Sequence, residues 1–152
     1  MLRSALALLI FVLVSPCLFA GAWGYKTFEN DDALDWLNDL DRNSSSGFLL
    51  DSLRAADPQA KYLEAPQCSQ ALAAAEVVAA AHGKPSKTLP ATAMHWVQRV
   101  KPTVTSELLA AARSAVDACR DSDHSELREL LHESKQFSAW LADTASLKSR
   151  LY

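Results

Sequence analysis

The alanine-rich segment at residues 66–82 constrains the fold more than any other part of this 152-residue chain. It contains two runs of three alanines, at 73–75 and 79–81. Gly83 follows it, and glycine is a natural C-terminal stop for a helix. Small side chains let neighbouring helices approach closely, so this segment is predicted to be a helix at the centre of a helical bundle.

Helical periodicity extends through the rest of the chain, and no stretch alternates apolar and polar residues as a half-buried strand does. Five of the predicted helices cover residues 31–41, 48–56, 66–82, 90–100 and 136–151. Another begins at residue 103 or 105 and ends at 119, and a further one follows residues 122–123. Seven short helices joined by polar turns predict an all-α fold, a compact bundle in a single domain over residues 21–152.

Several side chains have expected positions on these helices. Asn30 is the expected N-cap of the first helix, and Asp123 with Glu126 has capping-box spacing at the start of the sixth. The residues expected to face inward on the fourth and sixth helices are Met94, Val97 and Val100, and Leu127, Leu130 and Leu131.

The first 20 residues form a separate region. Sixteen of the 20 are apolar, Arg3 adds a positive charge, and small residues follow at positions 20–22. This is typical of a secretory signal peptide cleaved after Ala20, and it predicts a periplasmic or secreted protein. A cut after Ala22 fits the local small-residue rule better, but it would remove part of the motif at residues 21–40.

Two alternatives to a cleaved signal remain open. An uncleaved inner-membrane anchor needs about 20 apolar residues, and this stretch is slightly short and interrupted by Pro16. A lipoprotein would use Cys17, although a proline directly before that cysteine fits the small-residue requirement poorly. After cleavage, no stable membrane insertion is expected.

Net charge and composition limit the classes of partner that this protein could bind. Removal of Arg3 leaves 14 basic residues against 18 acidic ones, a net charge of −4. A mildly acidic domain without a basic run is not expected to bind nucleic acid. A basic protein is the partner that this charge favours.

Cleavage leaves two cysteines, Cys68 and Cys119. Each lies in phase with the apolar face of its predicted helix, one near a helix start and the other near a helix end, so antiparallel packing would bring them together. A disulfide closing a loop of about 50 residues stabilises by roughly 3–4 kcal/mol in the chain-entropy model. Two separate buried thiols are the alternative.

The most distinctive motif is at residues 21–40: GAWG at 21–24, FENDDA at 28–33 and DW at 35–36. It resembles a family of small bacterial proteins, the domain-of-unknown-function family 4259, and weaker likeness continues at 73–80 and 123–130. The resemblance implies an all-α fold and supplies no activity or catalytic residues.

Two interpretations of this motif remain open. In one, the glycines form an N-terminal hook that packs Trp23, Tyr25 and Phe28 against the first helix. In the other, the motif forms a binding site. The candidate binding residues are Trp23, Tyr25, Asp31, Asp32 and Asp35. The aspartates repel one another on a helix surface. Their excess charge indicates a basic partner or a weak cation site, and a solvated acidic face is the alternative.

Other chemistry has little support in the sequence. His82, His95, His124 and His132 lack metal-ligand spacing, and no nucleophile elbow or glycine-rich phosphate loop is present, so neither a metal nor a cofactor is expected. Glu29, Glu76 and Glu133 are candidates for an acid–base pair, but nothing in the sequence singles them out.

The sequence therefore favours an exported, non-enzymatic protein-binding module, similar in role to an immunity protein or inhibitor. The alternative is a small periplasmic hydrolase or ligand-binding protein that uses the region of Trp23, Asp31 and Asp35. A self-associating envelope protein is a third possibility.

Overall fold

Helix α3 (Ala65–Ala81) is the axis of the computed structural model, which describes residues 24–121 and 123–152. It contacts every other helix, and each residue from 71 to 80 is buried. The surrounding helices are α1 (Asp31–Arg42), α2 (Gly47–Arg54), α4 (Ala91–Val100), α5 (Ser106–Arg120), α6 (Glu126–His132) and α7 (Phe137–Arg150). The prediction of an all-α bundle around the alanine-rich segment is confirmed.

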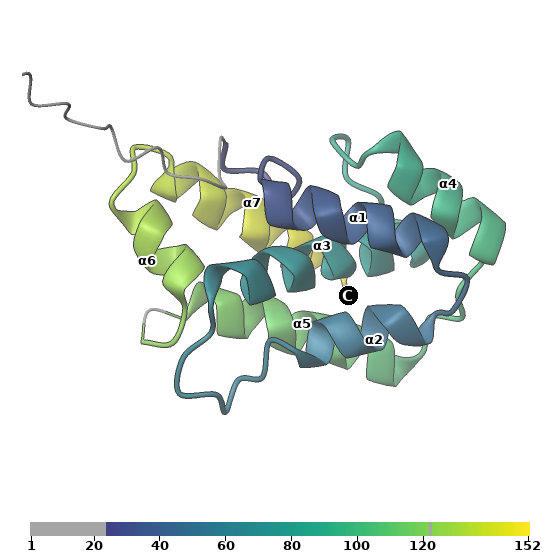
Figure 1. Cartoon of the computed structure of the whole chain (residues 1–152), viewed down its shortest axis with the longest axis horizontal. Helices are drawn as coiled ribbons and strands as arrows, with labels where there is room; N and C mark the ends of the chain where they lie inside the picture. The colour runs from purple at the N-terminus through teal and green to yellow at the C-terminus, as the bar shows by residue number, and fades with distance from the viewer. Residues whose placement is uncertain (1–23, 122) are drawn as a thin grey trace, which may run out of the picture.

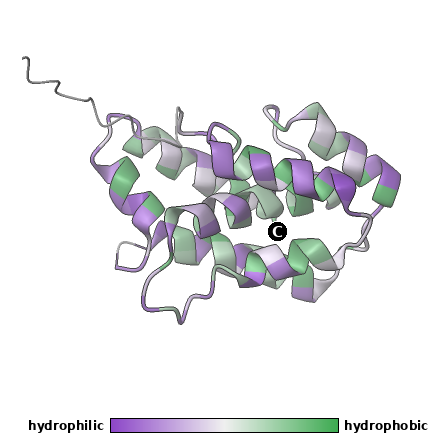
Figure 2. Cartoon of the chain, viewed as in Figure 1, coloured by the Kyte–Doolittle hydropathy of each residue, from purple (hydrophilic) through white to green (hydrophobic). Residues whose placement is uncertain are grey.

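The outer helices are arranged around α3 in pairs. In Figure 1, α1 and α4 lie above α3, α2 and α5 lie below it, α6 lies at the left-hand end, and α7 runs from that end toward the C-terminus near the centre of the view. The outer helices carry hydrophilic residues between their hydrophobic ones (Figure 2), as expected when only one face of each helix meets the core.

Three expected helix ends are confirmed. The Asn30 side chain accepts a hydrogen bond from the Ala33 amide at 2.8 Å and caps α1. The Thr105 hydroxyl accepts one from the Leu108 amide at 3.1 Å and caps α5. Gly83 follows α3 with φ of 85°, a left-handed conformation that favours glycine.

The predicted capping box of the sixth helix is wrong. Ser125, not Asp123, is the N-cap of α6, and its hydroxyl accepts a hydrogen bond from the Arg128 amide at 3.2 Å. A short parallel bridge between Leu63 and Ser125 holds the chain extended up to that point, so the helix cannot begin earlier. Leu130 is 41% exposed and does not face the core.

The core-facing residues of the fourth helix also differ from the predicted ones. Ala93 and Trp96 are fully buried, whereas Met94, Val97 and Val100 are half-buried. The indole N–H of Trp96 donates to the Asn43 carbonyl at 2.6 Å, which fixes the helix about its axis. The periodicity of aliphatic residues alone did not reveal this tertiary contact.

Cys68 and Cys119 form a disulfide, as predicted. Their Cα atoms are 5.4 Å apart, because Cys68 lies in the first turn of α3 and Cys119 in the last turn of α5. Disulfides persist in oxidising compartments, so the bond indicates a location outside the cytoplasm. Within residues 24–121 and 123–152, no helix combines the length and hydropathy needed to cross a membrane. The predicted signal peptide and Cys17 lie outside the described residues.

Candidate functional site

The predicted binding residues are divided between two places. Tyr25 is half-buried and lines a small pocket of about 20 Å³ together with residues of α3, α6 and α7, including Leu72, Leu131 and Trp140. Its neighbours in this pocket come from the hook itself and from α3, α6 and α7. Trp23 lies outside the described residues, so its predicted role stays a prediction.

The aspartates of the motif lie on the first turns of α1. Asp31 and Asp35 are exposed, and Asp32 is half-buried. Burial raises the pKa of Asp32, and the neighbouring charges of Asp31 and Asp35 raise this pKa further. Within the described chain, none of the three carboxylates forms an ion pair. They form an acidic face, defined here as Asp31, Asp32 and Asp35.

The segment at residues 24–30 forms a tight hook before α1. The Gly24 amide donates to the Glu29 carbonyl at 3.2 Å, and the Glu29 amide donates to the Lys26 carbonyl at 2.9 Å. The Lys26 amide donates to the Glu29 carboxylate at 3.2 Å. A Cβ at Gly24 would overlap the Glu29 side chain, so this close approach requires glycine.

A larger pocket, of about 280 Å³, opens behind this hook. Its walls come from the hook, α1, α3, the segment between α3 and α4, and α7. The lining residues are Lys26, Thr27, Phe28, Glu29, Leu34, Glu76, Ser86, Thr88, Leu89, Pro90 and Asp143. Asp31, Asp32 and Asp35 do not line it, so the acidic face and the pocket are separate features.

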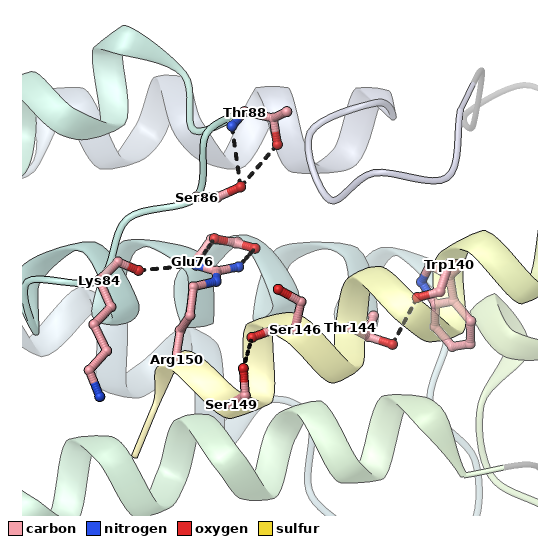
Figure 3. Close-up of polar contacts among 9 residues, drawn as sticks. All are labelled: Glu76, Lys84, Ser86, Thr88, Trp140, Thr144, Ser146, Ser149 and Arg150. Carbon is pink, nitrogen blue, oxygen red and sulfur yellow. Dashed lines mark hydrogen bonds and ion pairs between the residues drawn. The ribbon is translucent and has the colours of Figure 1, made fainter.

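Glu76 is the buried charge of this pocket. It is 3% exposed in the middle of α3, and the Arg150 guanidinium donates to both carboxylate oxygens at 2.6 and 2.8 Å. Arg150 also donates to the Lys84 carbonyl at 3.3 Å. Figure 3 shows Arg150 reaching from the end of α7 to Glu76, while Ser86 and Thr88 lie on the segment that passes over the pair.

Asp143 is the second carboxylate on this side of α3. It is half-buried on α7, and burial raises its pKa. The Glu76 carboxylate raises this pKa further, while Arg150 and Lys26 oppose the shift. No hydrogen bond or ion pair involves Asp143 within residues 24–121 and 123–152. A half-buried carboxylate without a partner is a common feature of functional sites.

The structure brings together two of the three glutamates considered from the sequence. Glu29 and Glu76 line the same pocket, whereas Glu133 is exposed at the end of α6. Neither Asp143 nor Arg150 was predicted as a site residue from the sequence. The sequence signal available for this pocket was Glu76, because it is the single charged residue between the two alanine runs of a buried helix.

Metal ligation has no support in the described part of the chain. No group of three or more His, Cys, Asp and Glu side chains there has an arrangement that would hold an ion. His124 instead faces the Lys61 carbonyl through Nδ1 at 3.2 Å, and His132 packs edge-on against Phe137.

Comparison with known proteins identifies the family. No curated protein matches this chain, and no solved structure matches it. The model of one family, the domain of unknown function DUF4259, matches residues 21–143. This range includes the hook, the acidic face, the disulfide and every residue that lines the larger pocket. The resemblance seen in the motif at residues 21–40 is thereby confirmed, and the chain belongs to the DUF4259 family.

Proposed function

We propose that this chain is an exported, non-enzymatic binding protein that docks a basic protein partner through the acidic face of α1. A partner of this kind fits an immunity- or inhibitor-type role, in which a small acidic domain covers and blocks a basic enzyme. The observation that carries the proposal is the unpaired state of Asp31, Asp32 and Asp35 in the described structure.

The contrast with other acidic residues supports this proposal. On the same helix, Asp39 pairs with Arg42 at 3.6 Å and Asp41 pairs with Arg99 at 3.2 Å. The first turns of α1 instead accumulate like charges that raise the pKa of Asp32. The helix N-terminus compensates for charges only within its first turn, which leaves Asp35 without this benefit.

A basic partner would relieve this repulsion. Complementary charge across an interface also accelerates association and selects against partners of the wrong sign. An inhibitor that must find its target enzyme quickly benefits from both effects. The acidic face therefore suits recognition of a protein surface rich in Lys and Arg.

Export to the periplasm or the medium is part of the same proposal. The disulfide supports an oxidising compartment. The family match begins at Gly21, directly after the expected cleavage site at Ala20. The disulfide supports export, and the start of the family match places residues 1–20 outside the domain; cleavage after Ala20 is the form of export proposed here.

Affinity capture from periplasmic extract tests the proposal. The wild-type bait should retain a specific basic protein, and D31N/D35N should lose most of it because the complementary charge is removed. D51N/E133Q, which neutralises exposed carboxylates on α2 and after α6, is the matched control and should retain the partner. Equal capture by all three baits, or capture by none, would contradict a docking role for the acidic face.

A further inference from the structure

We propose that the pocket of about 280 Å³ behind the hook binds a small primary ammonium ion with a short alkyl body, and that the Asp143 carboxylate receives the ammonium group. This site is separate from the acidic face. The inference therefore goes beyond protein docking and does not depend on it.

The hydrogen-bonding state of the three pocket carboxylates supports Asp143 as the binding group. Glu76 is held by Arg150 through both of its oxygens. Glu29 accepts from the Lys26 amide at 3.2 Å, which fixes it within the hook. Asp143 has no such partner in the described chain, so its oxygens remain available to a ligand.

The charge balance around Asp143 favours a cation. The charged groups that face it are Glu76 from α3, Arg150 from its own helix, and Lys26 and Glu29 from the hook. Glu76 and Arg150 compensate each other, and Lys26 and Glu29 carry opposite charges. The negative charge of Asp143 is therefore the one without a compensating positive charge. A monocation would neutralise the pocket, and an anion would not.

The other walls define the rest of the ligand. Phe28, Leu34, Leu89 and Pro90 are apolar, and Ser86 and Thr88 contribute hydroxyl groups. The pocket volume is near the lower end of the range for small-molecule sites, about 300–1,000 Å³. Ser86 and Thr88 already hydrogen-bond to each other through their hydroxyls at 3.1 Å, and the Thr88 amide donates to the Ser86 hydroxyl oxygen at 3.2 Å (Figure 3). A primary ammonium has three N–H donors, which suit the Asp143 carboxylate and the lone pairs that these hydroxyls have left. A quaternary ammonium has none.

Titration of the purified protein with n-butylammonium chloride tests this site. Amide NMR shifts should change at residues 26–29 and 86–89, with a Kd of about 1 mM or tighter, a range reached by small polar fragments. Sodium butyrate and tetramethylammonium chloride should give no saturable shifts. Saturable binding of butyrate, or no butylammonium response at about ten times that Kd, would overturn the proposal.

Three variants identify the residues responsible. D143N should weaken butylammonium binding at least about tenfold, which corresponds to the loss of a charge-assisted hydrogen bond. K26M should strengthen binding, because the Lys26 ammonium lines the same pocket and repels a bound cation. D31N/D35N should bind as the wild type does, and this result separates the pocket from the acidic face. Unchanged affinity in D143N would place the ligand elsewhere and reject the assignment.

Acidification gives an independent readout. Protonation of Asp143 removes the charge that the ammonium needs, so binding should weaken as the pH falls. The raised pKa of Asp143 places this loss at a higher pH than an ordinary aspartate would. Binding that stays constant down to pH 3.8, the unperturbed value, would contradict the role of this carboxylate.

Discussion

Asp143 shows how one carboxylate can favour binding at the expense of stability. Burial, and then the Glu76 charge, raise its pKa above the unfolded value of 3.8. Between 3.8 and that raised value, the folded chain binds more protons than the unfolded chain does. The free energy of unfolding therefore falls as the pH rises through this window.

The D143N variant removes this ionisation. We expect it to be more stable than the wild type at pH 7, with a difference that shrinks as the pH falls toward 3.8. Urea unfolding across this pH range measures the effect, and D51N, at an exposed position on α2, is the matched control. A D143N variant that is less stable than the wild type at neutral pH would show that the ionised carboxylate stabilises the fold.

Gly24 is the residue on which the geometry of the hook depends. The G24A substitution should lower the free energy of unfolding by about 1–3 kcal/mol, because the new Cβ would overlap the Glu29 side chain. G47A is the control, since the nearest atom to its Cβ is the Ser45 hydroxyl oxygen at 3.3 Å. Equal denaturation midpoints for the two variants would argue against a close approach at Gly24.

At the scale of elements, α7 is held to α3 by the pair of Glu76 and Arg150. Both side chains are largely buried, with 4% and 17% of their surface exposed. Two charges in such a position stabilise the structure only while they compensate each other. Glu76 also lines the larger pocket, so the residue that holds α7 in place is part of the pocket wall.

Breaking this pair from one side should be costly. R150M leaves the Glu76 carboxylate buried without a partner and should lower the free energy of unfolding by about 3–5 kcal/mol. The double variant E76M/R150M should recover most of that loss, because no charge remains uncompensated. K148M, on the same helix, breaks a partly exposed pair with Asp117 and should cost less than about 1 kcal/mol.

Chemical denaturation of these variants, together with the single variant E76M, gives the coupling energy through a double-mutant cycle. If the double variant were no more stable than R150M, the loss would reflect packing by the arginine stem rather than its charge.

At the scale of the whole molecule, the disulfide and a short backbone bridge join three distant segments. The disulfide links the start of α3 to the end of α5. Next to it, the Leu63 amide donates to the His124 carbonyl at 2.6 Å, and the Glu126 amide donates to the Leu63 carbonyl at 3.0 Å. The ends of α3, α5 and α6 therefore meet at one point.

Removal of the disulfide should destabilise the whole fold. C68A/C119A should lose about 3–4 kcal/mol of unfolding free energy, the chain-entropy cost of opening a loop of this length. Guanidinium unfolding measures the loss, and a phosphine reductant should lower the stability of the wild type but not that of the variant. Two alkylatable thiols in the native, non-reduced wild type would contradict the bond.

Local sequence determined a large part of this structure. Apolar periodicity located all seven helices of the described chain, and the predicted cap at Asn30 is correct because it acts within one helical turn. Of the two predicted start positions of α5, Thr105 is the one that caps it. The alanine runs identified the central helix, since small side chains favour burial on every face. The pairing of Cys68 with Cys119 could also be predicted from the sequence. The two cysteines lie at opposite ends of their helices, so antiparallel packing of the helices is enough to bring them together.

Tertiary structure decided the rest. The orientation of α4 depends on Trp96 reaching Asn43, and the start of α6 depends on the bridge to Leu63. The larger pocket depends on the packing of the hook, α1, α3 and α7, which brings Glu29, Glu76 and Asp143 to one cavity. Periodicity shows which face of a helix is apolar, but not which residue of a distant helix it meets. The packing of the helices sets those contacts, and with them the buried pair and the free carboxylate of the pocket.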